Sequence, residues 1–144
     1  MLFANRAARY LEKNQGTLLC LLDQNFLMGD PRPFFMLEAG DITRFNNVGN
    51  YASYCRCVSG ARYSNGKKKG NSNTKNGNKY LAWAFVEAAN FAIRYNETVK
   101  RYYQRKLTKS HPAVAKKTVA HKLARACFYV LRDQVAFDVN KAFG

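Results

Sequence analysis

The feature that most constrains the fold is a long basic stretch without acidic residues. Between Ile42 and Val86 the chain carries eight Lys or Arg side chains and no Asp or Glu. Its centre, residues 62–79, holds one aromatic side chain and no branched aliphatic one, and is otherwise Gly, Asn, Ser, Thr, Lys and one Arg. Such a segment is too polar to form a packed core and too positive to lack an anionic partner. We expect a surface loop that contacts nucleic acid, because phosphodiesters attract backbone amides, hydroxyls and ammonium groups.

Composition supports a single basic domain, or a fragment of a larger protein. The chain has 144 residues, 47% of them hydrophobic, and a formal net charge of +15. That charge favours polyanionic partners. The longest apolar run, Leu18–Leu22, is far shorter than the roughly 20 residues that span a bilayer, so we expect no membrane partner. The expected location is the bacterial cytoplasm, in association with the nucleoid.

The cysteines do not follow the disulfide pattern of secreted proteins. A zinc site built from the Cys55–Cys57 pair with His111 and His121 has the wrong ligand spacing, and His121 falls on a predicted helix. We therefore expect reduced, mostly buried thiols at all four cysteines, which are Cys20, Cys55, Cys57 and Cys127.

Hydrophobic periodicity predicts an all-α fold. Apolar residues recur three or four apart in two long segments, which predicts one helix over 79–106 and another over 112–132. Asn78 is the expected N-cap of the first, and Pro112 suits the first turn of the second. The short turn between them predicts a long antiparallel helical hairpin. Shorter helices are expected around the basic loop, over residues 2–13, 34–40 and 51–57, with Asp41 capping a further turn through Phe45 and a last apolar cluster near the C-terminus.

An ordered set of sequence blocks resembles one protein family. The blocks are Leu37-Glu-Ala-Gly-Asp-Ile-Thr-Arg-Phe45, Ala52-Ser-Tyr54, Ser64-Asn-Gly-Lys-Lys-Lys-Gly70, Lys75-Asn-Gly-Asn-Lys79, Glu87-Ala-Ala89, Val119-Ala-His-Lys-Leu-Ala-Arg-Ala-Cys127 and Asp138-Val-Asn-Lys-Ala-Phe-Gly144. In this order they resemble the C-terminal domain of the IS-one-ten family of insertion-sequence transposases, in particular its IS-eleven-eleven branch. The resemblance covers roughly residues 36–144.

The resemblance implies a mechanism. Such transposases pair an N-terminal RNase-H-like domain, which holds Mg²⁺ through an acidic quartet, with this helical C-terminal domain. The C-terminal domain supplies a serine that attacks the DNA backbone and forms a phosphoserine intermediate, and an RNA encoded by the element guides the choice of DNA. On the family pattern that serine is Ser64, with Ser59 and Ser72 as the nearby alternatives if the register differs. The nucleic-acid-binding residues expected around it are Arg62, Asn65, Gly66, Lys67, Lys68, Lys69, Gly70, Lys75, Asn78 and Lys79.

Two departures from the family pattern limit the expected activity. The Mg²⁺-binding domain is not in this chain, so no cofactor is expected within it. Residues 1–35 are interpreted as a degenerate or truncated N-terminal segment, because the family's helix-hairpin-helix turn is not recognisable there. Residues 23–35 hold a different sequence in its place, which is what a local shift of the reading frame in the gene would produce. We expect a chain that binds DNA and a guide RNA, that assembles with itself or with full-length transposase, and that does not transpose alone.

Several residues have a simpler structural interpretation. Glu38 and Asp41, one helical turn apart, resemble a metal pair, but helix-end capping and pairing with Arg44 are favoured. Tyr80, Trp83, Tyr102 and Tyr103 could stack on bases, although Trp83 and Phe85 are expected to pack inside the helical hairpin. His121 is interpreted as a helix-face residue and not as a general base.

Two functions of other classes remain open on the sequence. A non-catalytic basic nucleic-acid-binding protein of ribosomal or nucleoid type would have the same charge and size. It would keep its role when Ser64 is replaced by alanine. A regulator that disables full-length transposase by mixed assembly would need only the two long helices.

Overall fold

A computed structural model of the chain describes residues 39–58, 61–71, 75–133, 135 and 137–144. The elements in chain order are the 3-10 helix η1 (Ile42–Arg44), α4 (Val48–Tyr54), β1 (Ala61–Ser64), β2 (Lys67–Asn71), α5 (Lys79–Tyr95), α6 (Glu97–Leu107), α7 (Pro112–Asp133) and α8 (Val139–Phe143). Helices dominate the fold, which confirms the all-α prediction. The expected helix over 2–13, Cys20 and most of the expected helix over 34–40 lie outside the described residues.

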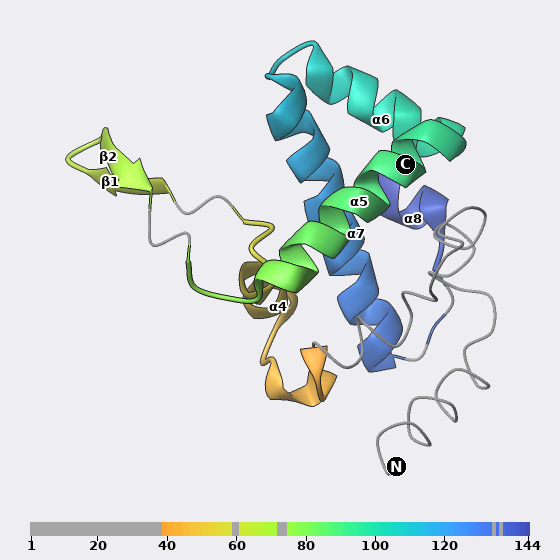
Figure 1. Cartoon of the computed structure of the whole chain (residues 1–144), viewed down its shortest axis with the longest axis horizontal. Coiled ribbons are helices and arrows are strands. Elements are labelled where there is room, and N and C mark those ends of the chain that lie inside the picture. Colours follow the sequence, from red (N-terminus) through yellow and green to blue (C-terminus); the bar gives the residue numbers. More distant parts are fainter. Residues whose placement is uncertain (1–38, 59–60, 72–74, 134, 136) are drawn as a thin grey trace.

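The prediction of one continuous helix over 79–106 is wrong, because Asn96 divides it. Asn96 has an extended backbone, with φ −120° and ψ 118°, between α5 and α6. Its side-chain oxygen accepts a hydrogen bond from the Val99 amide at 3.1 Å, so it is the N-cap of α6. Asparagine competes for backbone donors in this way and favours helix ends over helix interiors. As a result α5 and α6 are separate helices, and both pack against α7 (Figure 1).

The other helix ends follow the sequence. The Asp41 carboxylate accepts from the Thr43 amide at 2.9 Å and starts η1, which confirms capping as its role. Asn78 caps α5 by accepting from the amides of Tyr80 and Leu81, at 2.8 and 3.0 Å. Pro112 is the first residue of α7, where its missing N–H has no cost.

Tyr51 of α4 lies at the centre of the core and joins three helices. It is fully buried, and its ring centroid lies 5.8 Å from that of Phe128 on α7 and 6.5 Å from that of Phe85 on α5. Its hydroxyl oxygen lies 3.7 Å from the Cys127 sulfur. Cys55, Cys57 and Cys127 are free, buried thiols, as the sequence predicts. The short helix expected over 51–57 begins earlier, at Val48, because Asn47 caps it.

The C-terminal helix closes the other end of the bundle. Phe143 of α8 is fully buried, and its ring meets that of Tyr102 on α6 edge to face at 5.4 Å. Phe85 is buried as expected, but Trp83 is 57% exposed, so the prediction that it packs inside the bundle is wrong. It follows Tyr80 by one turn on the outer face of α5. In the described part of the chain no helix is both long and apolar enough to cross a membrane.

Candidate nucleic-acid interface

The centre of the basic stretch is a β-hairpin and not the irregular loop that its composition predicts. β1 and β2 pair antiparallel around the two-residue turn Asn65-Gly66. Both turn residues have positive φ, 51° and 72°, which is the geometry of a type I′ turn. Asn-Gly is the dipeptide that favours this turn, so a hairpin signal was present in the sequence. Figure 1 shows that the hairpin stands apart from the helices.

The pairing places Ser64 opposite Lys67, directly beside the turn. Residues directly opposite each other in an antiparallel pair point to the same face, with Cβ atoms about 4.5–5.5 Å apart. Tyr63 pairs with Lys68 and therefore faces the other side. Ser64 is half-buried, whereas Tyr63 is 69% exposed. The predicted nucleophile thus lies at the end of a strand, next to an exposed ammonium group.

A β-bulge shapes the second strand. The register shifts between Arg62 and Tyr63, so that Lys69 is the extra residue between Lys68 and Gly70. Gly70 has φ +130°, a conformation that a residue with a Cβ rarely adopts. A bulge of this kind bends the strand and re-aims its side chains. Lys67, Lys68 and Lys69 are all exposed.

Among the described residues, no acidic side chain pairs with the three lysines of the hairpin turn region. No residue from Ile42 to Val86 is acidic. None of Lys67, Lys68 and Lys69 forms an ion pair with any residue that the structure describes. Three adjacent exposed lysines without acidic partners make a surface that attracts phosphate groups.

Arg56 fixes the base of the hairpin, a role that the sequence pattern did not single out. It follows α4 with a left-handed backbone, φ 55°. Its guanidinium donates hydrogen bonds to three successive carbonyl oxygens, those of Lys75, Asn76 (3.2 Å) and Gly77 (3.1 Å). The Asn78 amide also donates to the Tyr54 carbonyl at 2.7 Å. These bonds join the chain that leaves the hairpin to the end of α4.

The first turn of α5 continues the basic surface from this base. Lys79 and Tyr80 are exposed, and the Lys79 ammonium lies 5.0 Å from the centroid of the Tyr80 ring. The side-chain oxygen of Asn78 is occupied in capping α5. Tyr102, another candidate for stacking on bases, is instead buried between α6 and α8. The side chain of Arg62 lies outside the described parts.

The described residues gather no group of three or more His, Cys, Asp or Glu side chains that could hold a metal ion. Burial and the nearby Arg125 lower the pKa of His121, which lies on α7 away from the hairpin. We therefore assign no metal ligand to this part of the chain.

Comparison with known proteins adds one finding. The model of a transposase family, described as the IS116/IS110/IS902 family, matches residues 33–104. The matched region contains α4, the hairpin, α5 and most of α6. No curated protein and no solved structure matches the chain significantly.

Proposed function

Because this chain belongs to the IS116/IS110/IS902 family of transposases, we propose that it acts in DNA transposition and contacts nucleic acid with the hairpin β1–β2. The observation that carries this proposal is the pairing of Ser64 with Lys67 at the exposed, acid-free tip of the hairpin. The tip lies within the region that the family model matches.

The hairpin has the chemistry that phosphate contact needs. The glycine at the turn brings no side chain, so the backbone can approach a phosphate closely. The three lysines supply positive charge on both faces and at the bulge. The Arg56 bonds hold the base of the hairpin, which reduces the freedom lost when nucleic acid binds.

The proposed role of Ser64 is nucleophilic attack. Its Oγ forms a bond to phosphorus while the bond from phosphorus to a deoxyribose oxygen breaks. The serine hydroxyl loses its proton, and the departing sugar oxygen gains one. A positive field lowers the cost of the serine alkoxide and of the charge that develops on the phosphoryl oxygens. Lys67, directly opposite Ser64, is the proposed source of that field. The described residues gather no group of three or more side chains that could hold magnesium, and no step is assigned to that ion.

A binding experiment tests the hairpin. We expect Lys67→Gln, Lys68→Gln and Lys69→Gln together to weaken DNA binding at least tenfold. The slope of log K against log salt should fall by about 2.7, because each lost phosphate contact removes about 0.9. The matched control is Lys109→Gln, Lys116→Gln and Lys117→Gln, which removes the same charge from the start of α7 and the turn before it. Equal losses for both triple variants would show that only net charge matters.

A second experiment separates the serine nucleophile from a binding-only function. The chain is mixed with an intact relative of the family and with DNA, and covalent protein–DNA adducts are measured on denaturing gels. Ser64→Ala should bind DNA as the wild type does and form no adduct through this chain. Ser53→Ala, an exposed serine on α4, is the control. Adducts that persist at the wild-type level in Ser64→Ala would leave the non-catalytic binding protein as the better description.

A further inference from the structure

A second group of cations surrounds the ring of Tyr102, away from the hairpin. Arg105 and Lys106 come from α6 and Lys122 comes from α7. Their charged groups lie 5.7, 5.4 and 4.8 Å from the centroid of the Tyr102 ring. Three cations thus share one aromatic ring, and none of them forms an ion pair with a described residue.

Repulsion within this group acts on Lys122. Burial lowers the pKa of its ammonium group, and the charges of Lys106, Arg105 and Arg125 lower it further. Arg125 lies one turn along α7 and is exposed. We call Arg105, Lys106, Lys122 and Arg125 the α6–α7 cluster. Holding four like charges together costs free energy unless an anion binds among them.

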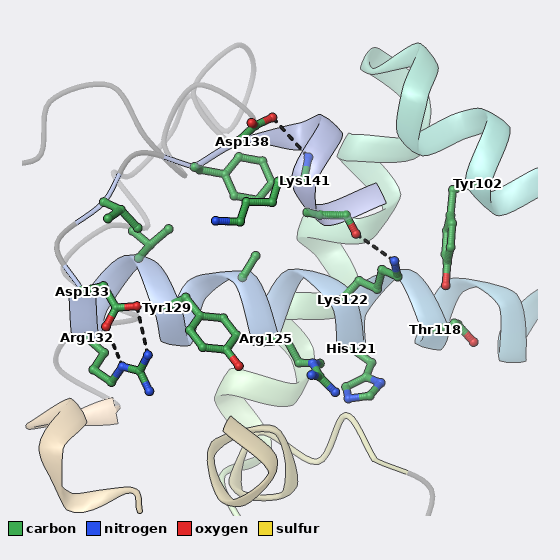
Figure 2. A pocket seen from close by; sticks show the side chains of 15 residues that line it. Tyr102, Thr118, His121, Lys122, Arg125, Tyr129, Arg132, Asp133, Asp138 and Lys141 are labelled. Carbon is green, nitrogen blue, oxygen red and sulfur yellow. Dashed lines mark hydrogen bonds and ion pairs between the residues drawn. The ribbon is translucent and has the colours of Figure 1, made fainter. Parts of the chain in front are cut away.

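A pocket of about 950 Å³ opens beside the cluster, between α7 and α8. Tyr102, Lys122 and Arg125 line it (Figure 2). The two acidic side chains that also line the pocket have other hydrogen-bond partners. Asp133 pairs with Arg132 through two hydrogen bonds, of 2.6 and 3.0 Å. Asp138 caps α8 by accepting from backbone amides. Neither carboxylate forms an ion pair with a residue of the cluster.

The cluster is held in place and keeps donors for a ligand. Lys122 uses one N–H to donate to the Ala142 carbonyl at 2.8 Å, which fixes its position between α7 and α8. An ammonium group has three donors and a guanidinium five. Lys122 and Arg125, the two members of the cluster that line the pocket, therefore keep most of their donors for oxygen atoms in it. Several cations around one opening suit phosphate, whose oxygens accept several charge-assisted hydrogen bonds at once.

We propose that the α6–α7 cluster is a second phosphodiester-binding site, separate from the hairpin, so that one chain holds two segments of nucleic-acid backbone. The site rests on the described contacts of α6, α7 and α8 and does not require that the hairpin binds DNA.

Binding of short duplexes of DNA and of RNA tests the proposal by fluorescence anisotropy. The background is the triple variant of Lys67, Lys68 and Lys69, which removes the hairpin lysines. Adding Lys106→Gln and Arg125→Gln should weaken the remaining binding about tenfold and lower the salt slope by about 1.8. The matched control, Lys109→Gln with Lys116→Gln in the same background, should lose less than twofold. Arg125→Lys, which keeps the charge, should retain most of the binding if the protein stays folded.

The outcomes separate the two sites and the two nucleic acids. Loss of binding to both duplexes assigns the pocket to phosphodiester backbone in general, and loss to one assigns it to that nucleic acid. A cluster variant that binds both duplexes as tightly as its matched control overturns the proposal. If the hairpin substitutions have no effect while the cluster substitutions do, the hairpin proposal fails and the second site stands.

Discussion

Gly77 packs directly against the backbone carbonyl of Tyr54, and a Cβ at position 77 would lie 3.1 Å from that carbonyl carbon. The carbonyl oxygen of Ser53 would lie 3.2 Å away. Gly77 also has φ +95°, a conformation that side chains disfavour. This contact connects the end of α4 to the start of α5, and Arg56 reinforces it by donating to the Gly77 carbonyl. The base of the hairpin is therefore held by direct contact between the backbone of Gly77 and that of Tyr54.

Replacing Gly77 with alanine should destabilise the fold. Because the neighbouring atoms are backbone, they cannot move aside as a flexible side chain would. We expect a loss of about 2 kcal/mol or more in the free energy of unfolding, measured by urea denaturation. The control is Gly66→Ala at the turn, where φ is +72° but no atom lies within 4 Å of the added Cβ. That variant should lose only about 1 kcal/mol. Equal losses would mean that the approach to Tyr54 is unimportant.

Arg56→Ala should loosen the base of the hairpin without unfolding the helices. Three carbonyl oxygens lose a charged donor, and hydrogen bonds to charged groups contribute about 1.5–3 kcal/mol each when removed singly. Amide exchange in residues 75–79 should accelerate, while exchange in α7 stays unchanged. Arg94→Ala, an exposed arginine on α5, is the control. Unchanged exchange in 75–79 would refute a supporting role for Arg56.

Asn96→Ala should weaken the junction between α5 and α6. The substitution removes the side-chain acceptor for the Val99 amide, and loss of an N-cap costs about 1 kcal/mol. Asn96→Asp keeps the acceptor and should retain stability close to that of the wild type, as thermal unfolding would show. A stable Asn96→Ala protein with one continuous helix would restore the simpler prediction over 79–106.

The buried thiols should make stability fall at high pH. Burial raises the pKa of Cys127 to about 12, although its hydrogen bond with Tyr51 partly offsets the rise. Burial likewise raises that of Cys57 to about 12, partly offset by Lys117. Between pH 9 and 12 the folded protein keeps thiol protons that the unfolded chain loses, so unfolding becomes easier as pH rises. Each thiol contributes up to about 1.4 kcal/mol per pH unit.

Urea denaturation between pH 9 and 11 measures this effect. Cys127→Ala should show a shallower decline of unfolding free energy with pH than the wild type. Ser53→Ala, which leaves every thiol in place, should decline in parallel with the wild type and provides the comparison. A Cys127→Ala profile parallel to that of the wild type would contradict the assignment.

Local signals explain which parts of the fold were predictable. The caps at Asp41 and Asn78 and the position of Pro112 at the start of α7 depend on neighbouring residues alone, and all three are as predicted. Asn96 is an equally local capping signal. It lies, however, in a segment whose strong helical periodicity favours one uninterrupted helix. The hairpin was obscured by composition, because Gly, Asn and Lys are typical of irregular loops, although Asn65-Gly66 favours a tight turn.

The missed site residues depend on contacts that are distant in sequence. Arg56 binds carbonyl groups about twenty positions later, and no local pattern predicts that. The α6–α7 cluster brings together side chains of two helices, three of them around the Tyr102 ring. Trp83 was expected to pack inside the bundle, yet the buried residues of α5 are Leu81, Ala84, Phe85, Ala88, Ala89 and Ala92. The role of Ser64 remains a prediction from the family resemblance.

Photo-crosslinking tests the central claim, that the hairpin is the nucleic-acid interface, most directly. DNA carrying 5-iododeoxyuridine is irradiated in complex with the wild-type chain, and crosslinked peptides are identified by mass spectrometry. We predict crosslinks within residues 61–71, with exposed Tyr63 as a favoured position, and their loss in the triple lysine variant. Crosslinks confined to other parts of the chain, with none in 61–71, would contradict the account.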